Sequence, residues 1–275
     1  MGAKRISDAV ALSLFAALLV LALVFAAIPL VVSFALSFDA RDYISRFPPT
    51  NFSWRWYVAF FTNPTYLEGL KTSMVVAVVA TAAATVTGVL AAVFMERYRF
   101  AGRDLMQAIF LSPLIIPSVV TGFSVLVFTA KIGIYEGMPR LLLGHTIISI
   151  PFVIRTTLAS LVGIRPSLTE ASMTLGANER QSFMHVTLPL AKTGIVAGAI
   201  FAFVMSFDEV AVSMFLSDPF TTTLPLALLS ETRANLTPTI AAVSVVFMVF
   251  TVFLIYALDR LVDLDRLVGH GIYRA

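Results

Sequence analysis

The sequence predicts an all-α integral membrane protein with six transmembrane helices and both termini in the cytoplasm. Of its 275 residues, 59% are hydrophobic and only 13% are charged, whereas a soluble domain carries about 25% charged residues. The mean hydropathy is +0.91. Because so few charged side chains cannot cover a water-facing surface, lipid must be the main solvent of this chain.

Six segments are long and apolar enough to cross the hydrocarbon core, which takes roughly 20 residues of helix. Prolines inside them do not cancel this prediction, because kinked helices survive in membranes when neighbouring groups satisfy the freed carbonyls. We expect one membrane domain over residues 1–275. Its predicted spans are 9–38, 72–95, 105–130, 141–164 (interrupted only by Arg155), 193–217 (interrupted only by Asp208 and Glu209) and 234–258.

The distribution of basic residues orients these spans. An even number of spans places both termini on one side, and cytoplasmic segments are enriched in Lys and Arg. With the termini inside, the inner segments hold more of these residues than the outer ones. The inner segments are 1–8, 96–104, 165–192 and 259–275. The aromatic outer segment 52–61 suits a helix lying at the membrane interface.

Several kinds of chemistry are excluded by composition. The chain has no cysteine, which rules out disulfides, thiolate metal sites and thiol nucleophiles. It also lacks the phosphate-cradling G-x-x-x-x-G-K-[ST] pattern. We therefore expect no cofactor, metal or catalytic residue in this chain and do not expect it to be an enzyme. A net charge of +3 is too small to suggest nucleic acid.

The longest inner segment, 165–192, looks structured. Loops longer than about 12–15 residues are usually functional. Its first half predicts a helix with Ser167 or Thr169 as N-cap, Glu170 in the first turn and Gly176 as C-cap. The second half, "NERQSFMHVTL", predicts another short helix, with Pro189 starting the next element. Such a hairpin has little apolar surface of its own, so we expect it to dock onto a cytosolic partner.

Residues 170–189 resemble the EAA loop of permease subunits from binding-protein-dependent ABC importers. The family pattern is Glu-Ala-Ala, three residues, Gly, nine residues, Ile, one residue, Leu-Pro. This sequence keeps the spacing, with Ser172 and Val186 as conservative departures. The matching residues are Glu170, Ala171, Ser172, Gly176, Val186, Leu188 and Pro189. The stretches "FPPTNFSWRWYVAFF" (47–61), "LSPLIIPSVVTG" (111–122) and "FDEVAVSMFLSDP" (207–219) resemble the polyamine branch of these permeases.

The resemblance implies the type I ABC importer permease fold in a bacterial inner membrane. It implies that 165–192 contains the coupling helix that docks on an ATPase. The implied partners are a second permease subunit (a heterodimer being favoured), an ATPase dimer that carries ATP and Mg, and an external solute-binding protein. The implied substrate is a polyamine or related amine. The alternatives are another small organic solute, an amino-acid derivative, iron or an anion.

Charged groups inside a predicted span are costly, so each one is a candidate functional residue. Asp208 and Glu209 lie 16 and 17 residues after Lys192, which is roughly 24 Å along a helix. With Ser206 and Phe207, they are our candidates for a substrate pathway or gate. The alternatives are that one acid caps or pairs with a helix end, or that it already lies in water at the outer side. For His145, a hydrogen-bonding role is favoured over ligand binding.

Two further questions stay open from the sequence alone. Small residues at four-residue spacing, in 80–88 and 194–198, suit close helix packing, either within the chain or at a subunit interface.

Two other functional classes also compete with an ABC importer permease. An ion-coupled secondary transporter would need inverted repeats, which are not evident. An intramembrane enzyme would need a shared catalytic proton, but Asp208 and Glu209 would point about 100° apart on a helix.

Overall fold

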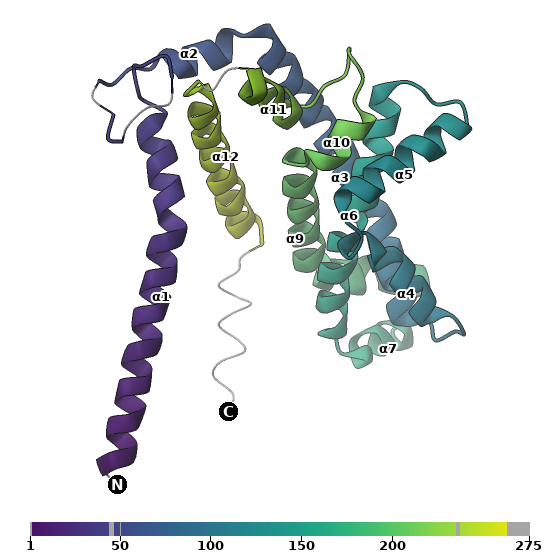
Figure 1. Cartoon of the computed structure of the whole chain (residues 1–275). Coiled ribbons are helices and arrows are strands. Elements are labelled where there is room, and N and C mark those ends of the chain that lie inside the picture. The colour runs from purple at the N-terminus through teal and green to yellow at the C-terminus, as the bar shows by residue number, and fades with distance from the viewer. Residues whose placement is uncertain (1, 44–46, 50, 235–236, 263–275) are drawn as a thin grey trace. The chain divides into compact units, whose positions relative to one another are not determined.

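The computed structural model describes residues 2–43, 47–49, 51–234 and 237–262, and these form helices joined by short connections (Figure 1). The all-α prediction is therefore confirmed for the described residues. The helices are α1 (Gly2–Leu36), α2 (Arg55–Thr62), α3 (Pro64–Arg97), α4 (Arg103–Leu111), η1 (Ser112–Leu114), α5 (Ser118–Lys131), α6 (Gly137–Val162), α7 (Pro166–Thr174), α8 (Glu179–Ser182), η2 (Phe183–Thr187), α9 (Leu188–Phe207), α10 (Ala211–Leu216), α11 (Leu224–Ala234) and α12 (Thr239–Val262).

Among the residues that the structure describes, four helices are long and apolar enough to cross a membrane by themselves. They are the Val10–Leu36 part of α1, then α3, α6, and the continuous helix Glu179–Phe207. They correspond to the spans predicted at 9–38, 72–95, 141–164 and 193–217. The last of these predictions was wrong in extent, because α9 ends at Phe207.

The segment predicted as one span over 105–130 is not a straight helix. Its two halves, Arg103–Leu114 and Ser118–Lys131, meet at an angle of 106°. Pro117 precedes the second half. Its ring restricts Ile116 to extended backbone and removes one donor, so the helix cannot run through. This segment is either a broken span or a re-entrant loop.

The sixth predicted span, 234–258, is represented by α12, whose apolar part is Thr239–Phe253. Residues 235–236 of that prediction, and 263–275 of the predicted inner tail, lie outside the described residues. The count of six spans and the sidedness of the termini therefore stay predictions.

The chain divides into two compact units: Met1–Asn63 with Glu231–Val249, and Pro64–Ser230 with Phe250–Ala275. A single domain over the whole chain stays a prediction. In the first unit, the loop after α1 is organised around the buried Asp39. Arg41 binds its carboxylate, and this hydrogen bond holds the pKa of Asp39 below its usual value. The Trp56 indole donates to the Asp39 carbonyl at 2.6 Å.

The second unit is built on α3, α6 and α9, which pack against one another. Ala80 and Ala84 of α3 are fully buried. A Cβ on Gly88 would lie 2.8 Å from the Cβ of Val153, and one on Gly194 would lie 2.5 Å from the Thr156 carbonyl oxygen. The small residues therefore let backbones of this chain approach closely. Of the two interpretations left open by the sequence, the structure supports packing within the chain.

Candidate functional site

The first helix of the hairpin, α7, begins at Pro166. Arg165 takes the N-cap position without a side-chain cap. Proline suits the first helical position because its missing N–H would be unbonded there anyway. The predicted N-caps Ser167 and Thr169 were therefore wrong. Glu170 lies in the second turn of the helix, not in the first as predicted.

Gly176 terminates α7 as the first residue after the C-cap position, which Leu175 occupies, one residue before the predicted C-cap. Its φ of 95° lies in the left-handed region, which glycine adopts without the clash that a Cβ brings. Its N–H donates to the Met173 carbonyl at 3.0 Å, and the Ala177 N–H reaches back to the Ser172 carbonyl at 3.1 Å. This pair of bonds satisfies the free carbonyls of the last turn and reverses the chain.

The second helix, α8, is also confirmed, and it begins with a reciprocal cap. The Asn178 side chain accepts from the Gln181 N–H, and the Gln181 side chain accepts from the Asn178 N–H, both at 2.9 Å. This satisfies two backbone donors that a helix start leaves unpaired.

The prediction that Pro189 starts the next element is confirmed to within one residue, because α9 begins at Leu188 with Pro189 in its first turn. No break separates α8 from α9, however. The π-helical turn η2 joins them, and the Leu188 N–H bonds to the Phe183 carbonyl five residues earlier. Pro189 has no N–H to donate. The wider turn lets the helix continue through it, and such π turns often occur at functional sites. The hairpin is thus continuous with the long apolar helix.

A side-chain hydrogen bond closes the hairpin. The hydroxyls of Ser172 in α7 and Ser182 in α8 lie 2.6 Å apart, and Ser182 is 1% exposed. Ser172 also donates to the Thr169 carbonyl at 2.8 Å. The Ser172 hydroxyl is thus within donating distance of both the Ser182 hydroxyl and the Thr169 carbonyl. The serine that departs from the family pattern therefore joins the two short helices.

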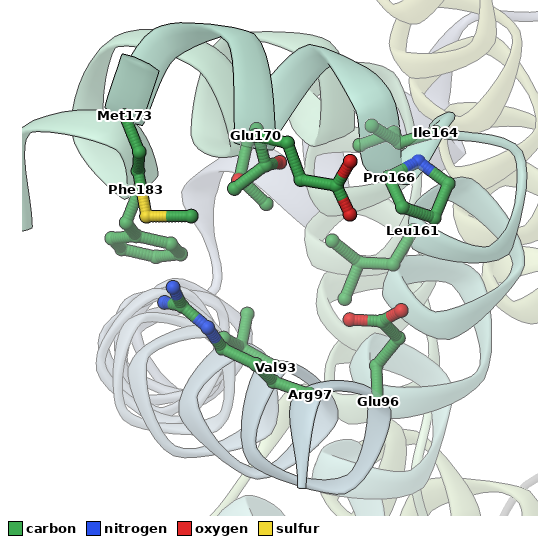
Figure 2. A pocket seen from close by; sticks show the side chains of 11 residues that line it. Val93, Glu96, Arg97, Leu161, Ile164, Pro166, Glu170, Met173 and Phe183 are labelled. Carbon is green, nitrogen blue, oxygen red and sulfur yellow. The ribbon is translucent and has the colours of Figure 1, made fainter. Parts of the chain in front are cut away.

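A cavity of about 290 Å³ separates the hairpin from the ends of α3 and α6. Figure 2 shows the carboxylates of Glu96 and Glu170 turned toward it from its two sides, while Arg97 reaches toward the Phe183 ring. The guanidinium of Arg97 also lies 3.7 Å from the Glu179 carboxylate of α8. The lining residues are Val93, Glu96, Arg97, Leu161, Ile164, Pro166, Thr169, Glu170, Met173, Phe183 and Thr187.

The contribution of α3 to this cavity was not predicted. Glu96 and Arg97 follow directly after the apolar run 72–95. Charged residues at the end of a span mark the membrane boundary on the side where the hairpin was placed. These charges indicate that the end of α3 lies on the same side of the membrane as the hairpin. They do not indicate that α3 contacts the hairpin.

The hairpin exposes apolar side chains to solvent. Leu175 is 89% exposed, and Leu168 and Met184 are each about half exposed. Single exposed apolar residues are ordinary, but these three lie on one short polar hairpin beside an open cavity. The arrangement suits a surface that another protein covers.

The second candidate region is the end of α9. The helix stops at Phe207 with Asp208 as its C-cap residue, and α10 begins at Ala211. The sequence predicted a helix running through Asp208 and Glu209, and this was wrong. The two acids lie in the break between helices, so the 100° separation expected on a helix does not apply.

The four residues predicted for a pathway or gate have different surroundings. The Glu209 carboxylate accepts the Val212 N–H at 3.1 Å and so caps α10. Phe207 is buried, with its ring 5.3 Å from that of Phe250. Ser206 is buried beside His145. Asp208 is exposed, and no hydrogen bond or ion pair joins its carboxylate to another described residue.

His145 holds this break from α6. Its Nδ1 lies 2.9 Å from the Ser206 hydroxyl, and its Nε2 lies 3.0 Å from the Ser213 hydroxyl. The predicted hydrogen-bonding role is confirmed. The partners were not predicted, because they come from two other elements far along the chain. The signal in the sequence that could have indicated this contact was weak: a histidine within the apolar span 141–164, and two serines on either side of the acidic pair about 60 residues later.

Comparisons with known proteins agree with this architecture. Residues 84–265 match the family of binding-protein-dependent transport system inner membrane components. The spermidine/putrescine transport system permease protein PotC of Shigella flexneri is 30% identical over 244 residues, which covers 89% of this chain and 91% of that protein. PotC of Haemophilus influenzae is 31% identical over 224 residues, or 82% and 86% of the two chains.

The fold is also similar to a solved structure. A chain of a bacterial ABC transporter that imports the acidic polysaccharide alginate matches with a TM-score of 0.70 over 90% of this chain and 95% of that one. The two are 16% identical, so this likeness speaks for the fold alone. The chain belongs to the family of binding-protein-dependent transport system inner membrane components, as a multi-pass permease subunit of an ABC importer with the type I permease fold.

Proposed function

We propose that this chain is the permease subunit through which an ATP-driven importer carries a polyamine into the cytoplasm. The observation that carries the substrate class is the similarity over most of the chain to spermidine/putrescine permeases. The exposed residue Asp208 supports it, because ionisable residues within membrane spans mark substrate pathways and a carboxylate attracts an amine cation.

The hairpin 166–189 is the proposed docking element for a partner ATPase. Its support is the exposed apolar surface at Leu168, Leu175 and Met184 and its direct continuation into α9. ATP and Mg would bind on the partner, since this chain has no phosphate-cradling motif. Docking would turn closure of the ATPase pair into movement of α9.

The complete importer would contain three further kinds of component. A second permease subunit, favoured as a different chain, would complete the pathway. Two ATPase subunits would dock on the paired hairpins, and an external solute-binding protein would deliver the solute. Delivery and ATP binding would open the pathway outward, and hydrolysis would reset it.

Within the pathway, we assign Asp208 the direct role. It is the exposed member of the four candidate residues. Glu209, Ser206 and Phe207 hold the helix break by a cap, a hydrogen bond and aromatic packing. The D208N change keeps the size of the side chain but removes its charge.

The test is solute-stimulated ATPase activity of the complete complex in proteoliposomes. The cognate binding protein is loaded in turn with putrescine, spermidine, a neutral amino-acid derivative or sulfate. We expect stimulation by the two amines. Stimulation only by a non-amine would overturn the polyamine assignment, and transport driven by an ion gradient without the ATPase would overturn the ATP-driven class.

A further inference from the structure

Buried His145 joins three elements around the helix break that carries Asp208. The residue lies in α6 and is 1% exposed. Neither of its side-chain partners belongs to α6: Ser206 is in the last turn of α9, and Ser213 is in α10. The imidazole therefore spans the break from one side to the other.

The hydrogen bonds around the ring have a defined direction. The Ser213 hydroxyl lies 2.7 Å from the Glu209 carbonyl, and a carbonyl cannot donate, so the serine proton is used there. The same oxygen must then accept from Nε2–H of His145. In the neutral ring, Nδ1 carries no proton and accepts from the Ser206 hydroxyl. One chain of bonds runs from Ser206 through the imidazole to the Glu209 backbone.

These hydrogen bonds restrain the backbone on both sides of Asp208. Ser206, two residues before it, is bonded directly to His145. The carbonyl of Glu209, directly after it, is bonded to Ser213, which is itself bonded to His145. The Glu209 side chain is tied to the Val212 N–H. A functional group is directed most accurately when its neighbours are locked by packing and hydrogen bonds.

We propose that His145 is a positioning residue, which fixes the backbone that carries the Asp208 carboxylate at the break and so supports the amine pathway without touching the solute. This inference rests on the proposed pathway role of Asp208. Close packing holds the α10 side of the break in place. A Cβ on Gly144 would lie 2.4 Å from a Leu216 side-chain carbon, and one on Gly122 would lie 3.0 Å from the Val212 Cα.

The first test measures position directly. The chain has no cysteine, so D208C in the assembled complex gives one spin-label site on this subunit, and the parent complex without D208C gives the background. We expect a restrained label with His145, a more mobile one in H145L, and recovery in H145Q, whose amide reaches the place of Nε2. Unchanged mobility in H145L would overturn the proposal.

A second spin-label site serves as the control that distinguishes a local effect at residue 208 from general loosening of the fold. Leu105 of α4 is exposed and takes no part in the network. L105C should report the same mobility with and without H145L. If both labels loosen together, His145 is a packing residue only, and the positioning role is wrong.

The second test measures function. H145L should lower amine uptake roughly tenfold, as expected when buried hydrogen-bonding groups lose their partner, and H145Q should restore most of it. In the D208N background, H145L should add little. An equal loss in both backgrounds would overturn the proposal. If D208N alone leaves uptake intact, the pathway role of Asp208 fails, and the label mobility still decides whether His145 positions residue 208.

Discussion

Ser172 stands where the EAA-loop pattern has alanine. Its hydroxyl is hydrogen-bonded to the hydroxyl of the buried Ser182. We predict that S172A loosens the hairpin, because the Ser182 hydroxyl loses this partner. A buried polar group left unsatisfied costs about 1–3 kcal/mol. Amide hydrogen exchange of residues 166–187 in the assembled complex should accelerate, by the factor in the opening equilibrium of the hairpin that this free-energy cost corresponds to.

The S172A/S182A double variant is the control for this prediction. Replacing both partners by apolar groups is often nearly neutral, so the double variant should exchange more slowly than S172A alone. If the effects of the two single changes simply add, the two hydroxyls do not stabilise each other and the interpretation is wrong.

Asp218 links the loop after α10 to the start of α6. Its carboxylate accepts the Gly137 N–H at 2.6 Å and the Phe220 N–H at 2.8 Å. Burial alone would raise the pKa of Asp218, but hydrogen bonds from Gly137, Phe220 and Thr221 outweigh it and hold the pKa below its usual value. The ionised form is therefore the one that the fold stabilises.

A group whose pKa is depressed on folding stabilises above its unfolded pKa, here about 3.9, and loses that contribution as the pH falls through its folded pKa. We predict that D218N lowers the apparent unfolding temperature of the complex at pH 7. The difference from the parent should shrink below about pH 4. A difference that stays constant from pH 7 to pH 3 would contradict the role of the charge.

At the scale of elements, the hairpin turn depends on Gly176. A Cβ on Gly176 would meet no atom within 4 Å, so only the positive φ of 95° opposes a side chain. We predict that G176A strains the docked form by about 1–2 kcal/mol and weakens ATPase binding roughly 5- to 30-fold. Titration of the purified ATPase against permease complexes measures this.

The matched control is Gly163, which ends α6 at a φ of −75°. There an added Cβ would make only an ordinary contact, 3.5 Å from the Ser160 carbonyl oxygen. G163A should leave ATPase binding unchanged, and G176N should fall between G176A and the parent, because asparagine tolerates the left-handed region. Equal affinities for G176A and G163A would exclude the turn as a determinant of docking.

These elements show which local features the sequence could predict. Gly176 and the second short helix follow from signals within a few residues, and the structure confirms both. The start of α7 was misplaced because Pro166 at the first helical position outweighed the hydroxyl residues that follow it. The end of α9 was missed because His145, Ser206 and Ser213 meet only in the folded chain. Hydrophobicity cannot report such a tertiary contact.

At the scale of the whole molecule, one continuous helix joins the two candidate regions. Glu179–Phe207 has 29 residues, which is about 43 Å at 1.5 Å per residue, longer than the hydrocarbon core of about 30 Å. Its first turns belong to the hairpin and its last turn precedes Asp208. The sequence placed both regions on this span, but the lining of the cavity by α3 required the structure.

The seam between α6 and α9 has to transmit any movement of the hairpin along this helix. A Cβ on Gly198 would lie 2.3 Å from the Thr156 Oγ1 and 2.8 Å from the Val153 Cα. We predict that G198A forces the two helices apart at a cost of about 1–3 kcal/mol, as expected for overpacking. The complex should unfold at a lower temperature and hydrolyse more ATP for each amine imported. Adding T156A should restore part of both properties, because it removes the Oγ1 contact and leaves the backbone contact. A G198A complex with parental stability and coupling would show that α9 moves independently of α6.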